Sequence, residues 1–272
     1  MTRMIAFYGK GGIGKSTVAS NLGVLFASRG NKVLLFGCDP KSDSCHSLVP
    51  GPVTTVMEKW QELGEADLRL THCLMNGRQG VDCLEVGGPV PGTGCGGRGI
   101  TKAFELVGQP DALEERYDVV LFDVLGDVVC GGFSAPLRAG YAREVYIVTS
   151  GEPRSLYAAN NICQAVVKNA VNGARLGGLV ANLRGGEKEL PRIERFAHLV
   201  GVSVVHAIPR DEAVVEAEIA RRPVVEWKKS SAAARAIEEL SRRLEEVSYS
   251  SLPVPRPLLR DEFDEFLAAE RG

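Results

Sequence analysis

The sequence lacks a strong charge imbalance, a long apolar run and a secretory leader. Its 32 Lys and Arg nearly balance 34 Asp and Glu, a formal net charge of −2. No general polyanion-binding surface is implied, so nucleic acid is not an expected partner. The apolar segment 4–8 is far too short to span a bilayer and does not fit an export signal. These absences favour a cytoplasmic protein with no membrane partner.

Closely spaced cysteine pairs are also absent. None of the seven cysteines forms a C-x-x-C pair, which excludes a zinc ribbon and a thioredoxin-like pair, and no four are spaced as in a ferredoxin. An odd number without an export signal indicates reduced thiols rather than a disulfide framework. Cys38 ends an apolar strand pattern and Cys163 lies in a helical one, so both are expected in the core. A metal site within one chain is therefore not indicated.

Neither an internal repeat nor a low-complexity linker interrupts the chain. Apolar runs rich in β-branched residues lie at 4–8, 33–37, 117–124, 144–149, 176–182 and 202–208, and helical patterns at 15–29, 155–170, 187–200 and 211–220. Continuous apolar strands alternating with helices predict an α/β fold, a mostly parallel sheet flanked by helices. Residues 50–100 are richer in turns and predict loops with short elements.

The C-terminal part changes character after residue 250. Residues 230–247 have a charged helical pattern, prolines in 251–257 must leave that helix, and 260–270 resembles a short amphipathic helix. We therefore predict one domain over residues 1–250 and a C-terminal arm over 251–272.

A complete phosphate-loop motif follows the first predicted strand and opens the first helix. It comprises Gly9, Lys10, Gly11, Gly12, Ile13, Gly14, Lys15, Ser16 and Thr17. The glycines allow backbone N–H groups to surround a β-phosphate, and the helix N-terminus adds partial positive charge. Lys15 would reach the β- and γ-phosphates, and the Ser16 hydroxyl would ligate Mg²⁺. The fold prediction is thus a single P-loop NTPase domain that binds ATP and Mg²⁺.

Lys10 makes this loop more specific. The pattern K-G-G-x-G-K-[ST] resembles the deviant phosphate-loop (deviant Walker A) ATPases, whose first lysine crosses a dimer interface to the partner's nucleotide. The resemblance implies a homodimer with facing ATP sites and a catalytic Lys10. The plainer alternative is a solvated loop lysine.

Carboxylates follow two of the predicted strands. Asp39 and Asp43 come after 33–37, while Asp123 and Asp127 come at the end of 117–124. Ligands of open α/β sheets bind at the carboxyl ends of strands, so all four can face the nucleotide. Asp123 fits a Mg²⁺-side acid acting through water, and either Asp39 or Asp127 could orient the attacking water. Each could instead be a cap or turn residue.

The glycine-rich stretch 91–100 differs from a phosphate loop, because it has no lysine and no following helix-start signature. It contains Cys95, and a second glycine-flanked cysteine, Cys130, follows Asp123 by seven residues. Glycine neighbours leave exposed amides that can donate to cluster sulfurs. Two ligands per chain become four on the axis of a symmetric dimer, so the pair predicts dimerisation.

Several motifs together resemble the nitrogenase iron protein family over about residues 3–250. They are Gly9–Ser16, Cys38–Lys41, Gly87–Pro89 with 91–92, 94–95 with 97–99, Asp123–Phe133 and Tyr157–Asn161. The resemblance implies a homodimer with one 4Fe–4S cluster on Cys95 and Cys130. Such proteins deliver single electrons to a heteromeric catalytic partner, coupled to MgATP hydrolysis, and receive them from a donor such as ferredoxin or flavodoxin.

The resemblance also implies roles for residues outside these motifs. Asn182, Pro209, Arg210 and Asp211 would line the adenine side of the nucleotide. Arg98 would lie on the docking face beside the cluster, and the matching arginine of some relatives is ADP-ribosylated. Without the resemblance, we would expect Arg98 to be an ordinary surface arginine.

The order of the motifs suggests how ATP and cluster are coupled. The loop from Asp123 to Cys130 joins the γ-phosphate side to a cluster ligand within one short segment. We expect nucleotide state to move that ligand and reshape the docking face, as in a GTPase switch.

The chain departs from typical nitrogenase iron proteins near the expected docking regions. It has Ser42, then Cys45-His46 in place of Thr-Arg, and Pro153-Arg154 in place of a Met pair. These differences bear on the partner. We favour a nitrogenase-like reductase of the methylthio-alkane type, with N₂ fixation or reduction of a tetrapyrrole (nickel sirohydrochlorin or protochlorophyllide) as alternatives.

Two hypotheses from other classes of protein stay open at this point. A partitioning or positioning ATPase would use the same loop, but it has no need of glycine-flanked cysteines and would be colourless when isolated without oxygen. An iron–sulfur carrier ATPase would donate a labile cluster, but such proteins usually carry a C-x-x-C pair.

Overall fold

The computed structural model describes residues 2–88, 97–108, 110–126 and 134–270, and the side chain of Arg98 lies outside that description. Within these ranges the strands are β1 (Arg3–Tyr8), β2 (Val33–Gly37), β3 (Met75–Asn76), β4 (Asp82–Glu85), β5 (Val119–Asp123), β6 (Glu144–Thr149), β7 (Arg175–Leu183) and β8 (Val204–Pro209). They form one sheet in the order β3-β4-β2-β5-β1-β6-β7-β8, in which only the β3–β4 pair is antiparallel. This confirms the predicted mostly parallel sheet.

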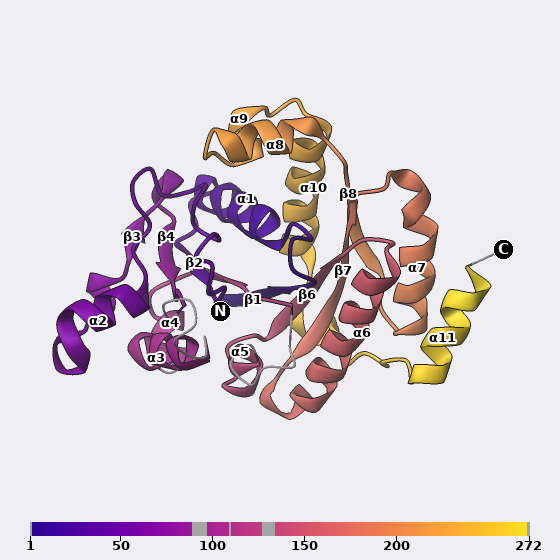
Figure 1. Ribbon diagram of the computed structural model, residues 1–272, viewed down its shortest axis with the longest axis horizontal. Helices are drawn as coiled ribbons and strands as arrows, with labels where there is room; N and C mark the ends of the chain where they lie inside the picture. Colours follow the sequence, from indigo (N-terminus) through magenta and orange to yellow (C-terminus); the bar gives the residue numbers. More distant parts are fainter. Residues whose placement is uncertain (1, 89–96, 109, 127–133, 271–272) are drawn as a thin grey trace.

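Helices cover both faces of this sheet (Figure 1). The α-helices are α1 (Lys15–Ser28), α2 (Val56–Asp67), α3 (Gly97–Val107), α4 (Pro110–Glu114), α5 (Ala135–Arg138), α6 (Pro153–Lys168), α7 (Leu190–Leu199), α8 (Glu212–Ile219), α9 (Val224–Trp227), α10 (Ala232–Glu246) and α11 (Arg260–Ala269). Helices α1, α8, α9 and α10 pack on one face, and buried residues of α3 to α7 and α11 belong to the core of the other. Among helices of the described ranges, none has the length and apolar character needed to cross a bilayer.

Strand β1 shows why its sequence is continuously apolar. Met4, Ala6 and Tyr8 belong to one core, whereas Ile5 and Phe7 belong to the other. Successive side chains of a strand point to opposite faces, so a strand covered on both sides buries every residue. Apolar runs without alternation are the sequence signature of this three-layer arrangement.

The turn-rich region 50–100 contains more regular structure than predicted. Strands β3 and β4 extend the sheet beyond β2, and α2 spans twelve residues. A capping box starts α2: the Thr55 hydroxyl accepts from Glu58 N–H at 3.1 Å, and the Glu58 carboxylate accepts from Thr55 N–H at 2.8 Å. That signal, Thr-x-x-Glu, was present in the sequence.

A helix does follow the glycine-rich stretch although its sequence has no helix-start signature, since α3 begins at Gly97. Its signal lies later in the chain. Ile100, Ala103, Phe104 and Val107 recur with helical spacing and are all buried. Burial of one apolar face stabilises a helix whatever its first residues are.

The C-terminal segment packs onto the same core as α6 and α7. Leu258 exchanges two hydrogen bonds with the Asn160 side chain, at 2.8 and 2.9 Å. Phe263 and Phe266 of α11 contact Phe196 of α7, with ring centroids 6.3 and 5.9 Å away. A domain boundary at residue 250 stays a prediction, but the arm shares the main hydrophobic core.

Candidate nucleotide site

The phosphate loop connects β1 to α1 at the carboxyl edge of the sheet. Strand β1 lies where the direction of strand addition reverses. Strands β2 to β5 all lie on one side of β1 in the sheet, and β6 to β8 lie on its other side. Ligands of open α/β sheets bind at such a point. Gly9, Gly12 and Gly14 have φ of 150°, 71° and 101°, a region that L side chains rarely adopt. A Cβ at Gly9 would lie 2.2 Å from the Val148 carbonyl oxygen, so the loop also needs glycine for close packing.

Both predicted lysines lie at this loop. Lys15 is buried, and its Nζ lies 3.4 Å from the carbonyl oxygen of Lys10. The Lys10 side chain is 40% exposed, and its Nζ lies 3.6 Å from a Glu152 carboxylate oxygen. Lys15 is thus held against its own loop, while Lys10 is partly exposed and, in the predicted role, would extend from there to a second subunit. Whether Lys10 does so stays a prediction.

Asp123 ends β5 beside the start of α1 and is 1% exposed. Its Oδ2 accepts a hydrogen bond from the Ser44 hydroxyl at 2.7 Å, whereas its Oδ1 has no partner among the described residues. Burial raises the pKa of this carboxyl, while Lys15 and the hydroxyls of Ser16 and Ser44 oppose that shift. A buried acidic oxygen without a partner, next to Ser16, fits a Mg²⁺ ion held through water.

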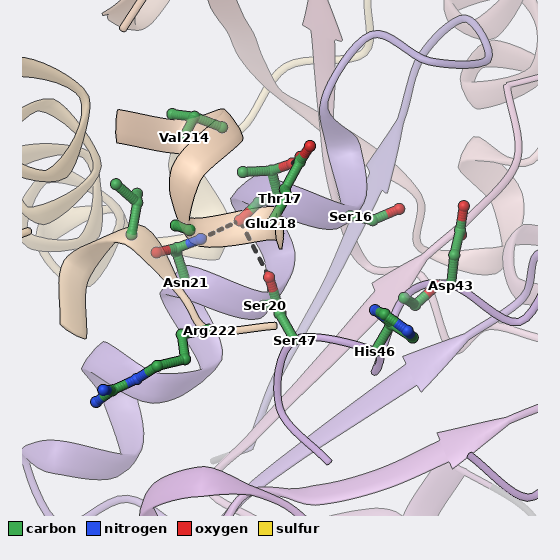
Figure 2. Close-up of a pocket in the computed structure, with 13 residues that line it drawn as sticks. Ser16, Thr17, Ser20, Asn21, Asp43, His46, Ser47, Val214, Glu218 and Arg222 are labelled. Carbon is green, nitrogen blue, oxygen red and sulfur yellow. Dashed lines mark hydrogen bonds between the residues drawn. The ribbon is translucent and has the colours of Figure 1, made fainter. Parts of the chain in front are cut away.

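Asp39 and Asp43 both lie in the loop after β2. Asp39 Oδ1 accepts from the Lys41 N–H at 2.9 Å and so stabilises a tight turn, in which Ser42 has φ of 57°. Asp43 lines a cavity of about 290 Å³ together with Ser16 and His46. Figure 2 shows this cavity, with Ser16 on α1 and Asp43 on the neighbouring loop. The predicted role of Asp39 in hydrolysis and the predicted nucleotide contact of Asp43 stay predictions.

A second cavity, of about 580 Å³, lies at the ends of β7 and β8. Gly12, Gly14, Thr17, Asn182, Pro209, Arg210 and Asp211 are among the residues that line it. Asn182 Nδ2 donates to the Ile13 carbonyl oxygen at 2.7 Å, which ties the end of β7 to the phosphate loop. The residues predicted for the adenine side thus meet the phosphate loop in one cavity.

Asp211 also has a structural task. Its two carboxylate oxygens each accept a backbone N–H at 3.0 Å, from Ala213 of α8 and from Ala233 of α10. These bonds, with that of Ala233 the strongest, lower the pKa of Asp211. Asp211 therefore caps helices at the cavity wall, and a direct nucleotide contact stays a prediction.

Two cavity residues were missed by the sequence analysis. Arg184 Nη1 donates to the Gly12 carbonyl oxygen at 3.1 Å, and Glu218 accepts from the Thr17 hydroxyl at 3.1 Å. Arg184 had a signal, since it directly follows a strand, at the edge where ligands bind. Glu218 had none, because only the packing of α8 against α1 brings it to Thr17.

The loop after β5 contacts the phosphate loop directly. A Cβ at Gly126 would lie 1.7 Å from the carbonyl oxygen of Gly9 and 2.8 Å from the Lys10 nitrogen. Two residues earlier, Val124 N–H donates to the Phe7 carbonyl oxygen at 3.0 Å. A backbone shift at Gly9 or Lys10 would therefore change the contact with Gly126.

Asp127, Cys95 and Cys130 lie outside the described residues, so their predicted roles stay predictions. Arg98 lies in the first turn of α3, and its side chain is outside the described part of the structure. Cys38 and Cys163 are fully buried in the same core, which confirms them as core residues.

The fold has three layers, and its glycine-rich loop follows β1, where the direction of strand addition reverses. These features define a P-loop nucleotide-binding protein of the α/β class. The septum site-determining protein MinD of Pyrococcus horikoshii, complexed with Mg-ADP, has a similar fold, with a TM-score of 0.69 and 24% identity over 90% of this chain and 97% of that one. The MinD cell division protein of Aquifex aeolicus is similar at a TM-score of 0.67 and 22% identity, over 95% and 100% of the two chains. At this identity the likeness shows the fold alone.

The sequence comparisons are more specific. A model of the family described as "4Fe-4S iron sulfur cluster binding proteins, NifH/frxC family" matches residues 3–271. Nitrogenase iron protein 1 of Methanothermobacter thermautotrophicus is 43% identical over 272 residues, 98% of each chain. The chain therefore belongs to the NifH/frxC family, an ATP-dependent, 4Fe–4S cluster-binding reductase component of the nitrogenase iron protein type.

Proposed function

We propose that this chain forms a homodimer with one bridging 4Fe–4S cluster and donates electrons to the catalytic component of a nitrogenase-like reductase, gated by MgATP hydrolysis. The observation that carries the proposal is the contact between Gly126 and the phosphate loop at Gly9 and Lys10. Only three residues separate Gly126 from Cys130. A nucleotide-dependent shift at the loop would therefore reach a cluster ligand through one short segment.

The nucleotide chemistry needs only positioned charges. Lys15 would neutralise the β- and γ-phosphates, and Ser16 with Asp123 would hold Mg²⁺, the latter through water. Lys10 of each subunit would reach the nucleotide of the other, so that hydrolysis requires the dimer. A water molecule oriented by Asp39 or Asp127 would attack the γ-phosphate and release phosphate, leaving ADP. Each event would change the position of the Asp123–Cys130 segment.

The buried cysteines support Cys95 and Cys130 as the cluster ligands. A cluster shared by two subunits requires thiolates at a subunit surface. Cys38, Cys45, Cys73, Cys83 and Cys163 are instead all buried. Burial raises the thiol pKa of Cys38, Cys45 and Cys163, which disfavours the thiolate form. When bound, the cluster supplies one-electron redox chemistry.

The partner is proposed from residues that differ from typical nitrogenase iron proteins. His46 lines the cavity beside Ser16 and Asp43, and Pro153-Arg154 form the first turn of α6. Because the family resemblance implies that these positions are near the switch and docking regions, we favour a nitrogenase-like reductase of the methylthio-alkane type. The relative named nitrogenase iron protein 1 favours N₂ fixation as the second candidate.

Anaerobic purification of the full chain tests the central proposal. We expect a dimer with one 4Fe–4S cluster per two chains, whose EPR signal changes on adding MgATP. Cys95→Ala and Cys130→Ala should each lose the iron, whereas Cys163→Ala, a buried core cysteine, should keep it. A wild-type protein without iron, or a Cys130→Ala dimer with a normal cluster, would contradict the proposal.

The partner protein is tested separately. We expect the reduced dimer to transfer electrons to a co-purified heteromeric component only in the presence of MgATP. The product of that complex, assayed with methylthio-alkanes, N₂ and tetrapyrroles in turn, distinguishes the candidates. Transfer of the intact cluster to apo-proteins would instead favour an iron–sulfur carrier.

A further inference from the structure

The carboxyl group of Glu85 lies buried beneath the loop that leaves β2. Glu85 is the last residue of β4, pairs with Gly37 at the end of β2 and is 0% exposed. A Cβ at Gly37 would lie 2.2 Å from Glu85 Oε2, so the glycine leaves the space that the carboxyl group occupies. Gly37 and Glu85 thus form a matched pair that places a buried acid at the carboxyl edge of the sheet.

Glu85 holds the loop over residues 38–47, here called the Asp39 loop. Its Oε1 accepts the backbone N–H of Cys45 at 2.6 Å. The preceding residue, Ser44, donates its hydroxyl to Asp123 Oδ2 at 2.7 Å. In the sheet, β4 and β5 lie on either side of β2, so the loop folds back over its own strand between two acidic groups.

The two attachments differ in what nucleotide binding would do to them. Asp123 lies beside Ser16, and its unpartnered Oδ1 suits the Mg²⁺ side, so a change at the nucleotide would act on the same carboxyl group whose Oδ2 holds Ser44. Glu85 belongs to β4, which flanks β2 on the side away from Asp123 and β5. The neighbouring Cys45 thiol is buried against the carbonyl oxygens of Leu35 and Leu84. The Cys45 attachment can therefore persist while the part of the loop from Asp39 to Ser44 moves.

We infer that Glu85 is a positioning residue, which fixes the Asp39 loop at Cys45 and so sets where Asp43 stands relative to Ser16 and Mg²⁺. The inference rests on the proposed function, whose nucleotide site it deepens. Glu85 touches no nucleotide itself; it acts through the Cys45 amide. Loss of its acceptor oxygen should weaken binding of the Mg²⁺–nucleotide complex more than binding of the nucleotide alone.

Two variants of nearly the same size isolate that oxygen. Glu85→Gln keeps an acceptor for the Cys45 N–H, and Glu85→Met fills the space without a comparable acceptor. In the anaerobically purified full chain, we expect Glu85→Met to bind MgADP about tenfold more weakly, with ADP affinity in EDTA within about twofold of wild type. Glu85→Gln should stay within about twofold for both ligands.

Three results would overturn the inference. In Glu85→Met the preference for MgADP over ADP could be unchanged, both affinities could fall together, or Glu85→Gln could lose as much as Glu85→Met. A general structural role predicts the second result, because a poorly folded site binds both ligands less.

Hydrogen exchange of the wild-type protein keeps the inference testable if Glu85→Met does not fold. The Cys45 amide should stay protected with and without MgADP, while exchange over residues 39–43 changes with the nucleotide. Rapid exchange at Cys45 in either state would overturn the inference. A wild-type protein that shows this protection but binds no iron would contradict the proposed function and leave the role of Glu85 intact.

Discussion

At the scale of single residues, the carboxyl edge of the sheet concentrates acidic groups in a dry environment. Burial is the main cause that raises the pKa of Glu85, to about 8, with the nearby Asp123 and Asp43 adding to it, while bonds from Cys45 oppose it. A carboxyl group with such a pKa is mostly protonated at neutral pH. It can then lie beside other acids without two adjacent buried charges.

The pKa of Glu85 predicts a specific pH dependence of stability. Its folded-state pKa lies above the ordinary value of 4.5, so its contribution is fully present below about pH 4.5 and is lost as pH rises through about 8. Glu85→Gln has no such loss. We expect the free energy of unfolding of wild type to fall relative to Glu85→Gln between these values, by on the order of a few kcal/mol.

Urea unfolding of both proteins at a series of pH values measures this difference. Parallel stability curves would show that Glu85 has an ordinary pKa in the folded protein. Because the two proteins differ only at residue 85, the difference between them reports the Glu85 carboxyl group together with its coupling to Asp123 and Asp43.

At the scale of elements, function depends on loops that contact one another at strand ends. The phosphate loop follows β1, the Asp39 loop follows β2 and the Gly126 loop follows β5, and these three strands are neighbours in the sheet. Their parallel direction brings all three loops to one edge. At Gly126 the loop after β5 lies directly against the phosphate loop.

Gly126→Ala should force these two loops apart. The new methyl group would lie 1.7 Å from the Gly9 carbonyl oxygen, a backbone atom that cannot rotate away. We expect a loss of about 1–3 kcal/mol in the free energy of unfolding without nucleotide, and weaker coupling of MgATP to the cluster EPR signal. Gly51→Ala is the matched control, since its Cβ would meet nothing within 4 Å. Equal stabilities of the two variants would show that the loops separate at no cost.

At the scale of the whole molecule, the C-terminal arm helps to cover the sheet. Phe263 and Phe266 pack among residues of α6 and α7, and Glu270 accepts hydrogen bonds from Arg192 and Arg195. Figure 1 shows α11 beside α7, far from the α1 face of the sheet. The arm therefore contributes to one core rather than forming a separate unit.

Phe263→Ala tests this role of the arm. Phe263 is 4% exposed, so its truncation should cost about 3–5 kcal/mol, with unfolding still a single cooperative transition. Leu259→Ala in the same segment should change stability by less than about 0.5 kcal/mol, because Leu259 is 72% exposed. An early transition confined to the arm, seen by hydrogen exchange, would show that it folds independently.

The sequence by itself determined the elements whose signal is local. Strands buried on both faces require unbroken apolar runs. From apolar runs, six strands were predicted within a few residues, including the half-buried edge strand β8. The phosphate loop was equally evident, because its glycines, Lys15 and Ser16 are consecutive in the chain. The family was visible in the same way, through short motifs such as those around Cys95 and Cys130.

Only the tertiary structure decided how distant segments meet. The short strands β3 and β4 and the start of α3 depend on packing rather than on local pattern. Arg184, Glu218 and Glu85 joined the site through contacts with residues far away in the sequence. The spacing of Cys130 from Asp123 suggested coupling, but the contact of Gly126 with Gly9 is a property of neighbouring strand ends. The physical reason is that the sequence alone determines the chemical groups of each residue and its local conformational preference. Its neighbours in space depend on the order in which the strands pair.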